Sequence, residues 1–167
     1  MKKDNKKALL IAITIPLLVG VISAIITKDS MSIFDNVTKP PLSPPSILFP
    51  IAWTILYILM GLASYYIYIN NDYMSNKYRR NSLILYVLQL IFNFFWSIIF
   101  FNMKAYFIAF IWLIIMWILI ILLMINARLV DKKAYYLLIP YIIWTTFAAY
   151  LNIGIALLNW QKPDFMV

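Results

Sequence analysis

The chain contains no cysteine and no histidine, and only six of its 167 residues are acidic. The absence of cysteine excludes a disulfide framework, a thiolate nucleophile and a cysteine-based metal cluster. Charged residues make up 12% of the chain and hydrophobic residues 65%. This composition leaves too little polar surface to cover a water-soluble globule of this size. The sequence therefore predicts a membrane protein.

Five apolar runs are each long enough to cross the hydrocarbon core of a bilayer, which takes about 20 residues. They cover residues 8–27, 46–69, 82–101, 105–125 and 134–158, and none contains Lys, Arg, Asp or Glu. Runs such as LIIMWILIILLMI are apolar all round, whereas a transmembrane β-strand alternates apolar and polar residues. We predict an all-α fold, with residues 1–167 forming one membrane domain of five helices.

The first apolar run has two interpretations. MKKDNKK followed by this run resembles a secretory signal, with VISA as the candidate cleavage site. The run is also long enough to span, and Gly20, Ser23, Ala24 and Thr27 have the small-residue spacing that allows close helix packing. We predict that it is retained as a transmembrane helix.

The basic residues predict the orientation of the spans. Five spans place the N-terminus on the same side as the second and fourth loops, and this side carries Lys2, Lys3, Lys6, Lys7, Lys77, Arg79, Arg80, Arg128, Lys132 and Lys133. The other side carries Lys28, Lys39, Lys104 and Lys162. By the positive-inside rule, the N-terminus is cytoplasmic, and the first loop and the C-terminus are outside. Anionic lipid explains the net charge of +8 without a nucleic-acid partner.

The entrance to the second span reads KPPLSPPSILFPIAWTILYILMG. Prolines stiffen the loop and favour a helix start, because proline lacks an N–H and restricts the residue before it. Trp53 and Tyr57 then lie on one helix face. Two interpretations remain open: a rigid lid over an aromatic wall, or an interfacial aromatic belt at the start of a helix.

Polar side chains within the third and fifth spans form two stripes. Gln89, Asn93 and Trp96 share one face of the third span. We expect the two amides to face inward, because lipid cannot satisfy their hydrogen bonds. The alternative to a ligand site is ordinary hydrogen bonding between helices.

In the fifth span, Tyr141, Thr145, Ala148 and Asn152 form a stripe of polar and small residues, with Trp144 on its flank. Together the three faces predict a cavity that would suit a flat aromatic ligand. Its predicted lining is Trp53, Tyr57, Gln89, Asn93, Trp96, Tyr141, Trp144, Ala148 and Asn152.

The three stretches KPPLSPPSILFPIAWTILYILMGLASY, QLIFNFFWSIIFF and LLIPYIIWTTFAAYLNIGIALLN, in this order on five spans, resemble the TspO/MBR family. This family comprises the tryptophan-rich sensory proteins of bacteria and the mitochondrial translocator protein. The resemblance implies a five-helix bundle, often homodimeric, in a bacterial plasma membrane. It also implies binding of porphyrins such as protoporphyrin IX and haem in a pocket beneath the first loop.

The resemblance also implies roles for single residues. Trp53 and Trp144 match pocket tryptophans implicated in light- and oxygen-dependent porphyrin degradation, and would be the catalytic residues if such degradation occurs. Asn93 and Trp96 match the motif of the third helix, and Ala148 matches a position where a bulkier residue weakens ligand binding. The first-loop signature is matched by Lys39, Pro40, Pro44 and Pro45.

The chain departs from the family pattern in the first loop. Ile33, Phe34, Leu42 and Ile47 stand where tryptophan or another aromatic residue is typical, which weakens any role that needs a loop tryptophan. The family's cholesterol consensus is not satisfied around Tyr150. Without histidine, haem iron would need a Tyr or Met ligand, or the tetrapyrrole would be held without ligation.

Three functions follow from these observations. The first is a tetrapyrrole-binding sensor or carrier of the translocator type, which stacks its planar ligand on tryptophans. The second is a porphyrin-degrading enzyme, although the residues form no constellation for chemistry in the dark. The third is a transporter of porphyrins or other small hydrophobic molecules. Ion coupling of such transport is disfavoured, because no acidic residue or histidine lies in a span.

Overall fold

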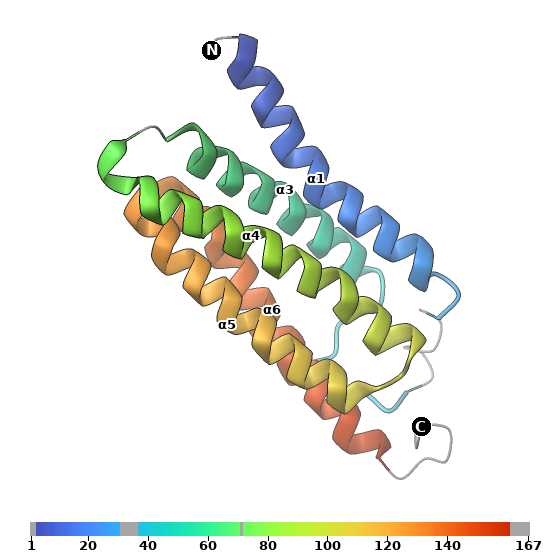
Figure 1. Ribbon diagram of the computed structural model, residues 1–167. Coiled ribbons are helices and arrows are strands. Elements are labelled where there is room, and N and C mark those ends of the chain that lie inside the picture. Colours follow the sequence, from blue (N-terminus) through green and yellow to red (C-terminus); the bar gives the residue numbers. More distant parts are fainter. Residues whose placement is uncertain (1–2, 31–36, 71, 161–167) are drawn as a thin grey trace.

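The computed structural model describes residues 3–30, 37–70 and 72–160, and this part of the chain forms five long helices (Figure 1). They are α1 (Lys3–Thr27), α3 (Leu48–Ile69), α4 (Asn76–Ser97), α5 (Tyr106–Val130) and α6 (Lys132–Asn159). A short 3₁₀ helix, η1 (Tyr73–Ser75), precedes α4, and a π-helical turn, η2 (Ile98–Asn102), follows it. All five long helices are long and apolar enough to cross a membrane. This confirms the predicted all-α bundle of five spans.

The helices extend beyond the predicted spans at several ends. α4 begins at Asn76 rather than Ser82, and α5 ends at Val130 rather than Ile125. Hydropathy marks only the part of a helix that is apolar, whereas the backbone hydrogen bonds continue into the polar interface. The third predicted span does not stay α-helical to residue 101: its last residues form the π-helical turn η2, and the N–H of Met103 donates to the carbonyl of Ile98 at 3.0 Å.

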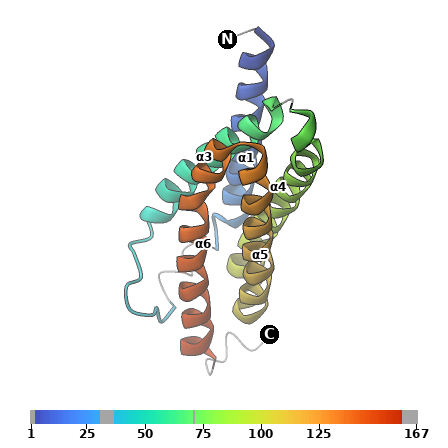
Figure 2. The ribbon, with the colours of Figure 1, turned by 90° about the vertical axis from the view of Figure 1, so that its left-hand side faces the viewer.

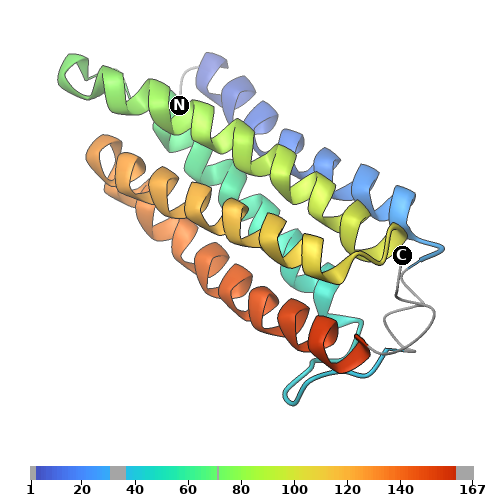
Figure 3. The same cartoon turned by 60° about the horizontal axis from the view of Figure 1, so that its bottom comes forward.

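The helices form a ring in which α3 packs against α1 and α6, and α5 packs against α4 and α6. Weaker contacts between α1 and α4 close the ring (Figures 1 and 3). α1 is the least buried helix: 11% of its apolar window is buried, against 33% to 39% in the other four. Figure 2 shows its N-terminal part extending beyond the rest of the bundle. Much of α1 therefore faces the surrounding lipid.

Two glycines bring α1 close to α3. A Cβ atom on Gly61 would lie 2.7 Å from the carbonyl oxygen of Ala12 and 2.7 Å from the Cα of Ile13, both of which are backbone atoms. A Cβ atom on Gly20 would overlap the ring of Tyr57. Small residues at such crossings are typical of membrane helix packing. Gly61 was not singled out from the sequence, whereas Gly20 belongs to the predicted small-residue stripe.

Polar contacts tie α5 to both of its neighbours. The indole Nε1 of Trp112 donates to the carbonyl of Phe92 on α4 at 2.8 Å. Trp117 Nε1 donates to the hydroxyl of Thr146 on α6, also at 2.8 Å. Asp131 is the single residue between α5 and α6, and its carboxylate caps α6 by accepting from a backbone N–H at 2.7 Å. α5 is therefore fixed in place on the side of the bundle away from α1.

Candidate functional site

A cavity of about 510 Å³ lies between α1, α3, α6 and the C-terminal end of α4. This volume is within the range of about 300–1,000 Å³ that is usual for small-molecule sites. Its lining comes from five parts of the chain. They are Leu17, Gly20, Val21, Ser23, Ala24 and Thr27 of α1; Ser46 and Ile47 just before α3, with Phe49, Pro50, Trp53, Thr54 and Tyr57 of α3; Trp96 and Ser97 of α4; Phe100 and Phe101 of η2; and Ala148, Leu151, Asn152 and Ile155 of α6.

Aromatic rings form two sides of the cavity. Phe49, Trp53 and Tyr57 recur every four residues along α3, so they share the face that α3 turns toward the cavity. The rings of Trp53 and Tyr57 are 5.6 Å apart and tilted by 31°. On the other side, Trp96 and Phe100 are stacked with their ring centroids 5.1 Å apart. A planar aromatic ligand can stack against such surfaces.

The cavity has polar groups but no charged lining residue among those described. Its polar groups come from hydroxyls such as those of Ser46 and Thr54, and from the amide of Asn152. Asn152 is 1% exposed, and its side chain accepts a hydrogen bond from Trp96 Nε1 at 3.1 Å and donates to the carbonyl of Tyr106 at 2.8 Å. These bonds hold the Trp96 ring in the cavity wall. A ligand buried here therefore meets rings and neutral polar groups.

Five of the predicted ligand-binding residues line this cavity. They are Trp53, Tyr57, Trp96, Ala148 and Asn152, and they come from three different helices. Ala148 is buried and has the small side chain that was expected where a larger one would close the space. These five residues therefore lie around one cavity, and their role in ligand binding stays a prediction.

Three further predicted residues lie behind the cavity wall instead of in it. Tyr57 donates its hydroxyl to Asn93 Oδ1 at 2.6 Å, Asn93 Nδ2 donates to the hydroxyl of Tyr141 at 3.4 Å, and Tyr141 donates to Gln89 Oε1 at 2.7 Å. Gln89, Asn93 and Tyr141 are at most 2% exposed. The expectation that the amides face inward is confirmed. Their place in the structure matches the alternative of hydrogen bonding between helices.

Trp144 also lies outside the cavity lining. Its ring packs edge-on against Phe49, with the centroids 6.0 Å apart and the planes at 72°, and Phe49 is the ring that reaches the cavity. Its indole Nε1 is buried without a hydrogen-bond partner among the described residues. The rotation of α6 about its axis thus places Ala148 in the wall and Trp144 one ring behind it.

The first-loop residues Lys39, Pro40, Pro44 and Pro45 do not line the cavity either. The loop is instead attached to α6 (Figure 3), where Asn159 forms a reciprocal pair with Thr38. The backbone N–H of Thr38 donates to Asn159 Oδ1 at 3.0 Å, and Asn159 Nδ2 donates to the carbonyl of Thr38 at 2.9 Å. Ile33 and Phe34, which replace expected tryptophans, lie outside the described residues.

Two more contacts fix the loop on α6. The hydroxyl of Tyr150 donates to the carbonyl of Pro41 at 2.8 Å. Gly154 lies beneath Pro40, and a Cβ atom there would be 2.7 Å from the proline ring. From this attachment the chain leads directly into Ser46 and Ile47, which line the cavity. Pro44 and Pro45 therefore directly precede lining residues without lining the cavity themselves.

Sequence reasoning missed one whole wall of the cavity. The α1 residues of this wall include Leu17, Gly20 and Ala24. The small-residue stripe to which Gly20 and Ala24 belong predicted close helix packing on this face, but not that the face lines a cavity. Phe49 could have been found, because it lies four residues before Trp53 on the face already identified. Phe100 and Phe101 lie in the π-helical turn, where the α-helical spacing fails.

The fold and the cavity define an integral membrane protein of five helices with an aromatic-lined internal space. The model of the TspO/MBR family matches residues 12–158. The chain belongs to this family. It is 35% identical over 162 residues to the tryptophan-rich protein TspO of Chlorobaculum tepidum, covering 93% of this chain and 99% of that one. It is 36% identical over 131 residues to the tryptophan-rich sensory protein of Cereibacter sphaeroides, covering 78% and 79%. A translocator protein homolog of Schizosaccharomyces pombe is 36% identical over 126 residues, covering 75% and 77%.

Proposed function

We propose that this protein binds a tetrapyrrole, such as protoporphyrin IX or haem, in the cavity between α1, α3, α4 and α6, as a membrane protein of the translocator or sensory type. The observation that supports this most is the placement of Trp53, Tyr57 and Trp96 around one cavity of about 510 Å³. A flat macrocycle gains both apolar burial and stacking from such rings.

The ligand's orientation follows from the distribution of polar groups. The cavity interior offers hydroxyls and one amide but no cation among the described residues, and burying an unpaired carboxylate is costly. The propionates of a porphyrin therefore point toward the end of the cavity near Thr27 and Ser46, where α1 ends and the first loop meets α3. The apolar edge of the macrocycle lies deeper, toward Tyr57.

Titration with protoporphyrin IX in the dark tests this proposal. We compare the wild type with Ala148→Leu, which places three extra carbon atoms in the cavity wall, and with Ala52→Leu, which makes the same change on α3 at a position outside the lining. Overpacking costs about 1–3 kcal/mol, so the Kd of Ala148→Leu should rise about 5-fold to 150-fold. Ala52→Leu should bind as the wild type does. Equal affinity of Ala148→Leu and wild type, at unchanged helicity, would overturn the proposed site.

Degradation of the porphyrin under light is a second candidate function. The observation in its favour is that the Trp53 ring lies in the cavity wall, where a bound macrocycle would contact it. Trp144 is separated from the cavity by Phe49. Light-dependent bleaching of the porphyrin that is lost in Trp53→Phe would support degradation. Stable porphyrin absorbance under illumination would exclude degradation, and binding would then be the remaining proposed function.

A further inference from the structure

A second cavity, distinct from the proposed tetrapyrrole site, lies at the other end of α1. Its volume is about 790 Å³. It is lined by α1 from Lys7 to Val19 and by α4 from Leu83 to Phe95, with Ser64 and Tyr68 of α3 contributing to it. Because the strongest contacts of α1 are with α3 rather than α4, this space is a groove between α1 and α4. We call it the α1–α4 groove.

The length of the α1–α4 groove matches one leaflet of a bilayer. Lys7 and Val19 are twelve residues apart, as are Leu83 and Phe95. At 1.5 Å per residue each wall is about 18 Å long, whereas half of the hydrocarbon core is about 15 Å thick. Val87, which lines the groove, is 54% exposed, so the groove opens to the surrounding lipid along its side.

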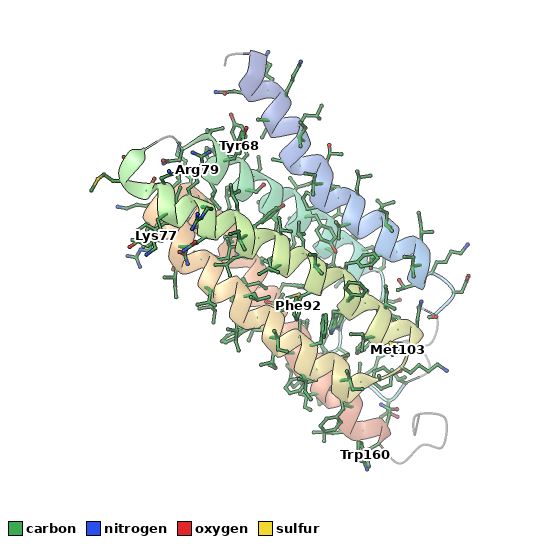
Figure 4. All side chains as sticks on the ribbon, viewed as in Figure 1. Tyr68, Lys77, Arg79, Phe92, Met103 and Trp160 are labelled. Atoms are coloured by element: carbon green, nitrogen blue, oxygen red, sulfur yellow. The ribbon has the colours of Figure 1, made fainter. Side chains whose placement is uncertain are left out.

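One end of the groove carries two cations and the rest is apolar. Lys7 is exposed and lines this end. The guanidinium of Arg79 lies over the ring of Tyr68, 5.9 Å from its centroid, and Tyr68 also lines the groove. Figure 4 shows Tyr68 and Arg79 side by side at this end, with Lys77 farther out. Below them the lining is chiefly aliphatic and aromatic.

We propose that the α1–α4 groove binds one anionic diacyl phospholipid from the leaflet on the N-terminal side. The lipid phosphate lies against Lys7 and Arg79, and one acyl chain runs along the groove toward Val19 and Phe95. Cations at the depth of the head groups attract anionic lipid, and basic sites between transmembrane helices bind such head groups. The acyl chain then fills the apolar part of the groove, so that no empty space remains between the lipid and the protein.

A second copy of the chain fits this groove less well than a lipid does. A two-fold interface applies the same surface patch of each subunit to the other, so the basic ends of both grooves would face the same interface. Two concave grooves facing each other would also enclose an unfilled space, which forfeits dispersion contacts.

Lipid binding to the purified full-length chain in detergent, measured by native mass spectrometry, tests the proposal. The probes are phosphatidylglycerol and phosphatidylcholine with identical acyl chains. We expect tighter binding of phosphatidylglycerol, and a loss of about fivefold in its affinity for each of Lys7→Ala and Arg79→Ala, since each cation near the surface contributes about 1 kcal/mol. Phosphatidylcholine binding should not change. Lys77→Ala, at the same end of α4, is the matched control and should retain wild-type binding.

A second variant tests the apolar part of the groove. Val87→Trp fills the space between α1 and α4 and keeps both cations, so it should weaken the binding of both lipids. Equal affinities for the two lipids in the wild type would overturn the proposal, as would a loss in Lys77→Ala as large as that in Lys7→Ala. It would also be overturned if Val87→Trp dissociates a dimer while phosphatidylglycerol binding persists, because a second copy would then occupy the groove.

Discussion

Replacing Asn159 with alanine should release the first loop from α6. The Asn159 side chain is 1% exposed and forms the reciprocal pair with the backbone of Thr38 described above. Its third bond, from Nδ2 to the carbonyl of Ile155 at 2.8 Å, lies within α6 and does not involve the loop. The substitution therefore removes two loop contacts and leaves the helix backbone intact.

The size of the effect follows from the exposure of the partner. Thr38 is exposed, so water replaces the lost partners once the loop lifts, and each bond contributes only its net value of about 1 kcal/mol. Together the two bonds stabilise the attached loop by about 2 kcal/mol, which corresponds to about a 30-fold change in the ratio of attached to released loop. The Tyr150 bond to Pro41 remains and limits the movement.

Hydrogen exchange measured by mass spectrometry is a direct assay, because the N–H of Thr38 is itself the donor in one of the lost bonds. We expect about 30-fold faster exchange at this amide in Asn159→Ala, as local opening requires less free energy. Asn126→Ala is the matched control: Asn126 is a half-buried asparagine whose side chain, among the described residues, bonds the Leu122 carbonyl of its own helix. Unchanged exchange at Thr38 in Asn159→Ala, or equal acceleration in the control, would refute the reasoning.

Two further substitutions separate packing from ligand contact. Tyr57→Phe removes the 2.6 Å bond to Asn93 and keeps the ring in the cavity wall, so thermal unfolding should show a loss of about 0.6–2 kcal/mol. The affinity of this variant for protoporphyrin IX should stay within about twofold of the wild-type value. A much larger loss of affinity would show that the hydroxyl also contributes to ligand binding. Gly61→Val places side-chain atoms against the backbone of Ala12 and Ile13, so α1 must move away and unfolding in SDS should report about 1–3 kcal/mol of destabilisation. Wild-type stability would exclude this close crossing.

The spans and the inward direction of their polar residues could be predicted from the sequence, because lipid imposes both. A bilayer offers no partner for an amide, so Gln89, Asn93 and Asn152 have to turn toward other helices. They are 0%, 2% and 1% exposed. The same argument cannot decide whether an inward amide meets a ligand or another helix. All three amides bond other side chains, but only Asn152 among them also lines the cavity.

The rotation of each helix about its axis could not be predicted. The small-residue stripe of α1 predicts a packing face but not a cavity wall, and the rotation of α1 is set by the close crossing at Gly61 and by the ring of Tyr57 against Gly20. Trp144 and Ala148 are one turn apart on α6, and a small rotation decides which of them reaches the cavity. Hydropathy also gives no signal for the π-helical turn that brings Phe100 to the wall.

The way in which α1 is attached to the bundle has a mechanical consequence. Among the described residues, several side-chain hydrogen bonds join α3, α4, α5 and α6 to one another, whereas α1 is held to α3 mainly by close packing at Gly20 and Gly61. Near its C-terminal end, the carbonyl of Ile26 also accepts from Asn102 Nδ2 of η2 at 3.2 Å. Helices tilt to match their hydrophobic length to the bilayer, and non-directional packing resists such tilting less than hydrogen bonds do. A thinner or thicker membrane should therefore change the distance between Gly20 and Tyr57, while the other four helices keep their arrangement. The thickness of the bilayer would then help to set the size of the internal cavity.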